Sequence, residues 1–304
     1  MKKIVKIFFG ISALFFSLSF VSNANALDIV FAEDRPDLRT LDPRITQSRH
    51  EEMLIVNIFD QLIAADSEGN HYPGLAKSWS VSSDGLEYTF NLRNDVTFHD
   101  GTKFNAAAVK ATFDSIVDPE TGSQGAVDIL GPYKETVVVD DYTAKVVFER
   151  RYGSALTAFT ETELSIVSPT ALSSLGNDGF GMAPVGTGPF MFKNWEANKK
   201  VELVRNPDYN WAPEYMDGSG PSQVANLTYR LIKDTSTRVA ALEAGEIDIA
   251  ELVPPLDMNR FDSSGDLATV AGTVSGLPYA AFLNTTVGVF QDINVRKAFF
   301  HSLD

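Results

Sequence analysis

One stretch of the sequence has the residue types that acid–base chemistry or metal binding requires. Residues 93–109, RNDVTFHDGTKFNAAAV, place His99 beside an aspartate and a glycine at an expected loop. Such a pair could act as a general acid and base, or bind a metal ion. Either role needs another histidine or carboxylate nearby. The other histidines, His50, His71 and His301, are far apart in the sequence and do not have the spacing of metal ligands. We therefore predict a structural His99, with no catalytic residue and no metal site.

The other motifs that could carry chemistry are incomplete. Residues 186–190, GTGPF, lack the third glycine of a dinucleotide loop and the lysine of a P-loop. Residues 66–70, DSEGN, supply only the first ligand positions of a calcium loop and predict a turn. The sequence contains no cysteine, no G-x-S-x-G and no H-E-x-x-H. These features favour a protein that is not an enzyme and uses no cofactor.

Hydrophobic periodicity predicts the elements that position these loops. Residues 27–32 are typical of a short buried strand, and residues 49–62 of a helix with one apolar face that includes Val56. Alternation predicts a strand over 87–93, followed by a second strand that buries Val96 and Phe98. A helix is expected next, with Asn105 as its cap.

The rest of the chain continues to mix helices and strands. Residues 135–150 predict two strands joined by a hairpin turn. A capped helix is expected from Thr235 or Ser236 to the glycine at 245, followed by a buried strand from Ile247. This alternation predicts α/β lobes rather than an all-β barrel.

The first 26 residues have the features of an export signal. Three lysines precede an apolar run at 7–21, and Ala24-Asn25-Ala26 supplies the small-residue pattern of a cleavage site. The apolar run is shorter than the roughly 20 residues that span a bilayer. We predict cleavage after Ala26 and a periplasmic location for the mature protein.

The mature chain is strongly acidic. Without the three lysines of the signal, it carries 22 basic and 40 acidic side chains, a net charge of −18. A surface of this sign repels nucleic-acid phosphates and anionic lipid. The charge therefore argues against a nucleic-acid partner, and it does not identify a small ligand.

Several segments together resemble one family, the extracytoplasmic solute-binding proteins of dipeptide, oligopeptide and nickel ABC importers. The resemblance covers nearly the whole mature chain and keeps the family's order. Its motifs are TLDP at 40, PGLAKSW at 73, SSDGLEYTFNLRNDVTFHDGTKF at 82, GTGPF at 186, RNPDY at 205, ALEAGEID at 241, FLNT at 282 and VRKAF at 295. The last expected helix, from Asn294, has no stop signal before Asp304, which predicts a piece of a longer protein.

The resemblance implies a fold and a division into lobes. Members are two-lobed periplasmic binding proteins of the α/β class, type II-like with an inserted subdomain, and ligand binds between the lobes. By this analogy, residues 27–45 and 180–275 form the first lobe, and 46–179 form the inserted subdomain. Residues 276–304 would contain the hinge and the start of an incomplete second lobe.

The resemblance also implies a function. The protein would be a monomer that captures di- or oligopeptides by lobe closure and delivers them to ABC permease subunits. Three departures, at Ala108, at Asn210 before Trp211 and at His301, leave the ligand subclass open. Nickel or other metal chelates, or oligosaccharides, are the alternative ligands, and a periplasmic hydrolase is the rival class.

Three loops are candidates for ligand contacts. Asp34 and Arg35 follow the first strand and could bind charged ends of a ligand, or form a solvated turn. Thr160, Glu161, Thr162 and Glu163 occupy a segment where relatives place cleft residues, although a surface loop explains them equally well. Tyr279, at the expected hinge, could stack on a ligand or pack in the core.

Overall fold

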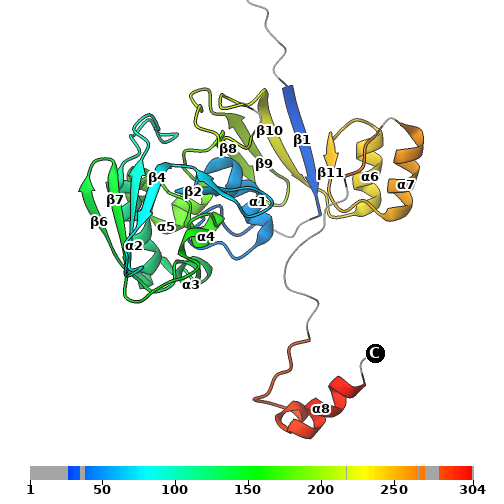
Figure 1. Cartoon of the computed structure of the whole chain (residues 1–304). Coiled ribbons are helices and arrows are strands. Elements are labelled where there is room, and N and C mark those ends of the chain that lie inside the picture. Colours follow the sequence, from blue (N-terminus) through cyan, green and yellow to red (C-terminus); the bar gives the residue numbers. More distant parts are fainter. Residues whose placement is uncertain (1–26, 35–37, 217, 266, 271–280, 303–304) are drawn as a thin grey trace, which may run out of the picture. The chain divides into compact units, whose positions relative to one another are not determined.

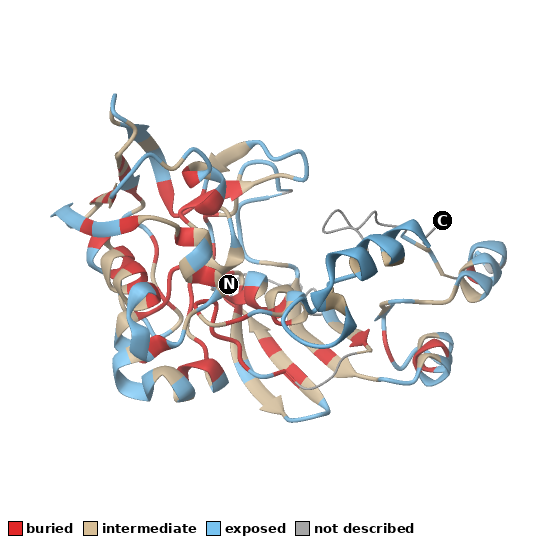
Figure 2. Ribbon diagram, turned by 90° about the horizontal axis from the view of Figure 1, so that it is seen from below, coloured by how far each residue is buried: buried red, intermediate tan, exposed pale blue. Residues whose placement is uncertain are grey.

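The computed structural model describes residues 27–34, 38–216, 218–265, 267–270 and 281–302 (Figure 1). Contacts divide the chain into two units, with the boundary between Val253 and Pro254. Buried residues of the first unit lie on strands, helices and connecting segments alike (Figure 2), whereas helix α8 of the second unit has none. Among the described helices, none has both the length and the apolar character that crossing a membrane requires.

A five-stranded sheet in the first unit joins distant parts of the sequence. Its order is β11-β1-β10-β9-β8, with β1 parallel to both β10 and β11, and β9 antiparallel to both neighbours. The strands are β1 (Leu27–Glu33), β8 (Phe190–Glu196), β9 (Lys200–Arg205), β10 (Val224–Leu231) and β11 (Ile249–Ala250). The predicted first strand is confirmed. Helix α6 (Thr235–Glu243) begins where expected, with the Asp234 side chain accepting from the Thr237 N–H.

Helix α1 (Arg49–Ile58) packs Ile55, Ile58 and Phe59 into the core of this sheet. The prediction that the helix continues to residue 62 is wrong. Phe59 is extended, and the Ile58 carbonyl accepts from the Gly188 N–H at 2.9 Å, so the chain turns away. Val56, placed on the apolar face by periodicity, is 48% exposed.

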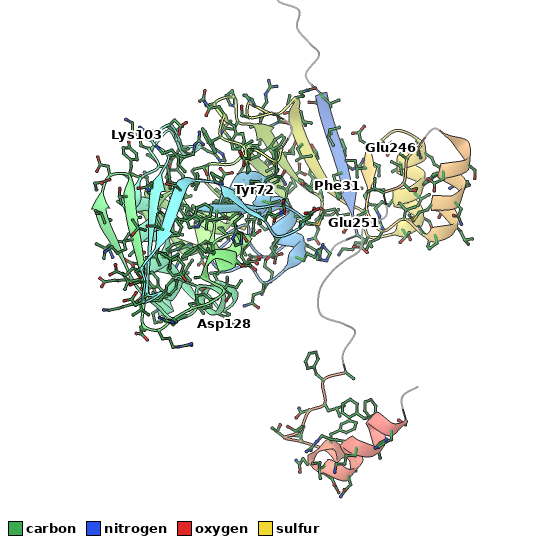
Figure 3. All side chains as sticks on the ribbon, in the orientation of Figure 1. Phe31, Tyr72, Lys103, Asp128, Glu246 and Glu251 are labelled. Carbon is green, nitrogen blue, oxygen red and sulfur yellow. The ribbon has the colours of Figure 1, made fainter. Side chains whose placement is uncertain are left out.

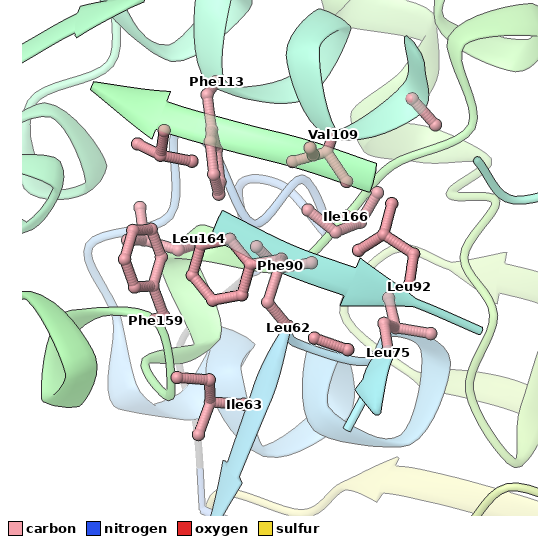
Figure 4. Close-up of a cluster of buried hydrophobic side chains, with 14 of the residues drawn as sticks. Leu62, Ile63, Leu75, Phe90, Leu92, Val109, Phe113, Phe159, Leu164 and Ile166 are labelled. Carbon is pink, nitrogen blue, oxygen red and sulfur yellow. The ribbon is translucent and has the colours of Figure 1, made fainter. Parts of the chain in front are cut away.

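A four-stranded antiparallel sheet contributes side chains to the larger core. Its order is β4-β5-β7-β6, and the strands are β4 (Ala76–Val81), β5 (Glu87–Leu92), β6 (Tyr133–Asp140) and β7 (Thr143–Phe148). Helix α2 (Ala106–Val117) packs on it, and Figure 4 shows Phe90, Phe113 and Phe159 within that core. The predicted hairpin and the Asn105 cap are confirmed, since the Asn105 side chain accepts from the Ala108 N–H.

Shorter elements complete the first unit. Strands β2 (Ile63–Ala65) and β3 (His71–Pro73) pair around the predicted turn at 66–70. The expected strand with Val96 and Phe98 is only an isolated bridge between Thr97 and Lys103, although both apolar side chains are buried as predicted. The remaining helices are η1 (Pro119–Thr121), α3 (Gly125–Leu130), α4 (Ala155–Ala158), η2 (Thr162–Leu164) and α5 (Pro169–Met182).

The second unit contains α7 (Pro255–Ser264), η3 (Val289–Gln291) and α8 (Ile293–His301). The helix expected near Asn294 is confirmed, and the Asp292 side chain caps it by accepting from the Asn294 N–H. The lobe boundaries implied by the resemblance stay a prediction, and residues 276–280, at the start of the segment expected to contain the hinge, lie outside the described residues.

Candidate ligand-binding site

One face of helix α1 is turned away from the core. Glu52 and Val56 lie one turn apart on this face, and Asp60 follows just beyond the end of the helix. Residues Thr160–Glu163 precede and enter η2, which packs against α1. The exposed face of α1 and this segment therefore lie side by side.

A cavity of about 440 Å³ opens beside the C-terminal end of α1. Its walls come from α1, β2, the segment at 160–162, the start of β8 and the loop at 209–222. Aromatic side chains contribute much of the lining, from Phe59, Phe190, Tyr209, Trp211 and Tyr215. The volume lies within the 300–1,000 Å³ typical of small-molecule pockets, and the apolar walls are also characteristic of such pockets.

Asp60 is the central polar group of the cavity. Its Oδ1 accepts from the Tyr209 hydroxyl at 3.1 Å, while Oδ2 accepts from the Trp211 indole N–H at 2.9 Å and the Thr187 hydroxyl at 2.8 Å. Burial raises the pKa of Asp60, and the three hydrogen bonds oppose that rise because they favour the carboxylate. Asp60 therefore fixes the aromatic loop to the end of α1.

The aromatic walls are held by further contacts. The Tyr209 and Trp211 rings lie 4.9 Å apart between centroids, and Tyr215 lies 5.0 Å from Tyr72 of β3, labelled in Figure 3. The Tyr72 hydroxyl donates to Asp66 at 3.0 Å. Rings fixed in this way form a wall before any ligand binds.

Three more carboxylates lie beside the cavity. Burial raises the pKa of Glu52, and the negative charge of Glu163 and then that of Glu161 add to the rise, while Arg49 opposes it. Burial also raises the pKa of Glu163, and the pKa of Glu161 is raised by burial and by Glu163. These groups repel one another, so a cationic partner would be stabilised here.

The structure places the predicted ligand contacts unevenly. Thr160 and Thr162 line the cavity, and Glu161 and Glu163 alternate with them along the chain. Asp34 is partly exposed after β1 and is not part of the cavity wall. Arg35 and Tyr279 lie outside the described residues. A role in ligand binding stays a prediction for all of them.

Asp60, Tyr209 and Trp211 are not predicted as site residues from the sequence. Periodicity places Asp60 in a continuing helix, and Asn210 before Trp211 is only a departure from the family's motif. An acidic residue in a mostly apolar stretch, IFDQLI, is the signal that could have drawn attention to this position, because a buried carboxylate needs donors.

His99 has the structural surroundings that were predicted for it. Its Nε2 donates to the Gly188 carbonyl at 3.0 Å, and its backbone N–H donates to the Gly186 carbonyl. Burial lowers the pKa of His99 to about 4, so the ring is neutral at pH 7. Within the described ranges, no group of three or more His, Cys, Asp or Glu side chains could hold a metal ion.

Comparison with known proteins gives a consistent picture. The glutathione-binding protein GsiB of Shigella flexneri is 28% identical over 279 residues, which cover 92% of this chain and 52% of that protein. NikZ from Campylobacter jejuni, in complex with Ni(L-His), superposes with a TM-score of 0.74 at 25% identity, covering 91% and 53% of the two chains. DppA from Helicobacter pylori, in complex with the peptide STSA, gives 0.67 at 28% identity, covering 77% and 48%.

These matches show the fold that the motifs implied, the α/β fold of periplasmic binding proteins. The chain spans about half the length of the curated relatives it matches. Residues 70–304 match the family described as bacterial extracellular solute-binding proteins, family 5 Middle, and the chain belongs to this family.

Proposed function

We propose that the protein is the periplasmic substrate-binding component of an ABC importer and that it captures peptides. Membership of the solute-binding family supports the general role. Relatives named for glutathione binding, or solved with a bound peptide, support the ligand class. The observation that carries the proposal to this chain is the preformed aromatic cavity, which has threonines of the expected ligand-contacting segment in its wall.

The proposed mechanism is capture by closure, without bond making or breaking. The protein would exist in open and closed forms, and the ligand would contact both lobes only in the closed form. Binding then shifts the open–closed equilibrium towards the closed form, by as much as the ligand's affinities for the two forms differ. Hinge closure of this kind is a familiar switching motion, and the permease would recognise the closed protein. We infer that the described part supplies the contacts of one lobe, and that the protein acts as a monomer.

Residues at 160–163 are the ligand contacts that we propose first. The threonine hydroxyls can donate to or accept from a peptide backbone, and Glu161 and Glu163 can bind its ammonium group. Asp34, Arg35 and Tyr279 are proposed as further contacts on the resemblance alone. A metal chelate is the second candidate ligand, since NikZ was solved with Ni(L-His).

Isothermal titration of the secreted protein with di- and tripeptides, glutathione and the nickel–histidine complex tests this function. We expect peptides to bind and to be recovered intact by chromatography. Glu163→Gln should weaken peptide binding, whereas Glu135→Gln, at an exposed position of β6, should not. Cleavage of a peptide would support the hydrolase instead, and binding of the nickel complex alone would support the metal-chelate alternative.

A further inference from the structure

The cavity wall contains a carboxylate, Asp60, that is held by neutral donors. No ion pair joins Asp60 to a basic side chain in the part of the chain that the structure describes. Arg93 is the basic group that acts on it electrostatically, but Arg93 is ion-paired with Asp95 at 2.7 Å. The donors bound to Asp60 are a phenol, an indole and a hydroxyl, all of them neutral.

Asp60 also retains hydrogen-bonding capacity. A carboxylate has about four acceptor positions, and the contacts described above occupy three of them, two on Oδ2 and one on Oδ1. Asp60 is partly exposed and lines the cavity, where a ligand atom could approach it. The remaining acceptor position on Oδ1 can take an N–H from a ligand.

The walls around Asp60 suit the same kind of ligand. The faces of Tyr and Trp rings attract cations, and they also cover apolar surface. Tyr209 and Trp211 form one such wall, and Val56, Phe59 and Phe190 form apolar parts of the remainder. Glu52, Glu161 and Glu163 add negative charge nearby, which favours the approach of a cation.

We propose that this cavity binds a cationic group, a primary ammonium or a guanidinium, carried on an apolar or aromatic body, with Asp60 as its counterion. The inference rests on the proposed function, because it assumes that the cavity binds part of the transported solute. It adds the chemical class of that part. Within a peptide, the class corresponds to the N-terminus or to a basic side chain. Among small solutes, it corresponds to aromatic or aliphatic amines.

The test compares two probes of similar shape and opposite charge, phenethylamine and 3-phenylpropionate. Binding is measured by calorimetry and by fluorescence, because Trp211 lies in the cavity wall. We expect phenethylamine to bind at least about tenfold more tightly, which corresponds to 1.4 kcal/mol. Equal affinities for the two probes, or no binding of either, would overturn the proposal.

Two variants locate the binding. Val56→Trp fills the cavity from an exposed helical position and should abolish phenethylamine binding, while Val117→Trp, at an exposed position of α2 outside the cavity, should leave it unchanged. Asp60→Asn should remove the preference for the amine. If Asp60→Asn loses its cooperative melt, the comparison of Val56→Trp with Val117→Trp still tests the proposal. Unchanged phenethylamine binding by Val56→Trp would contradict it.

The same measurements separate this inference from the proposed function. Phenethylamine binding without binding of any peptide would support the cavity assignment and contradict the peptide role. Peptide binding that is indifferent to charge and unaffected by Val56→Trp would support the peptide role and contradict the cavity assignment. Titrations with Ala-Lys-Ala and Ala-Glu-Ala measure whether peptide binding depends on the charge of the side chain.

Discussion

A buried ion pair near the first strand is the interaction whose loss should be most costly. Asp42 and Arg44 are both 0% exposed, with Arg44 Nη2 2.6 Å from Asp42 Oδ2 and Nε 3.0 Å from Oδ1. Arg44 also donates to Asn177 Oδ1 at 3.1 Å and lies 5.6 Å from the centre of the Phe180 ring. Since both partners belong to α5, the pair links the segment after β1 to that helix.

Arg44→Met would leave the Asp42 carboxylate buried, with the backbone N–H of residue 44 as its one remaining donor among the described residues. Breaking a buried pair by removing one partner costs about 3–5 kcal/mol. Removing both charges avoids the uncompensated anion, so the double variant Asp42→Leu/Arg44→Met should be more stable than Arg44→Met alone. The coupling should be on the order of 1 kcal/mol or more.

Urea unfolding followed by tryptophan fluorescence measures these effects, because all three tryptophans lie before residue 254. The matched control is Lys110→Met, which removes a half-exposed i,i+4 pair with Asp114 and should cost only about 0.3–0.5 kcal/mol. A loss for Arg44→Met no greater than that of the control would refute the reasoning.

Three further predictions concern the fold and export. The pKa of His99 in the folded protein is about 4, below the usual 6.5, so the free energy of unfolding should fall as the pH drops from 6.5 towards 4, by at most about 3 kcal/mol. Urea titrations at several pH values should show a shallower fall for His99→Gln, and an identical fall would contradict the role of His99. Gly186→Ala would bring Cβ into a clash with the Ile58 carbonyl oxygen and should cost at least about 1–3 kcal/mol in urea unfolding. Gly153→Ala places Cβ in open space and should be tolerated, so equal losses for the two variants would contradict the packing argument. Mass spectrometry of the periplasmic fraction should find a chain that begins at Leu27, and an uncleaved chain would contradict the export signal.

Local patterns predicted the elements that local interactions decide. The alternation of β5 and the cap of α2 depend on residues within a few positions of each other, and both are confirmed. The end of α1 depends instead on the Gly186–Phe190 turn, whose backbone approaches Ile58 from more than 100 residues away. Periodicity alone would continue the helix through Phe59 and Leu62, so the distant contact prevails.

The site could be predicted only in part, for the same reason. The resemblance points to Thr160 and Thr162, which lie in the cavity wall and whose role in ligand binding stays a prediction. The aromatic wall is assembled from segments near 59, 190 and 209–222. Each aromatic residue alone is typical of a core position. Only the fold shows that their polar atoms converge on Asp60.

Asp60 can serve both the wall and a ligand because hydrogen bonds do not neutralise a charge. The donors from Tyr209, Trp211 and Thr187 favour the carboxylate and orient the loop, and they oppose the burial that raises the pKa of Asp60. A cation that reaches Oδ1 meets a site already ordered, so it loses little affinity to the ordering of side chains. An anion of the same shape is repelled at the same site. The cavity should therefore distinguish ligands by the sign of their charge.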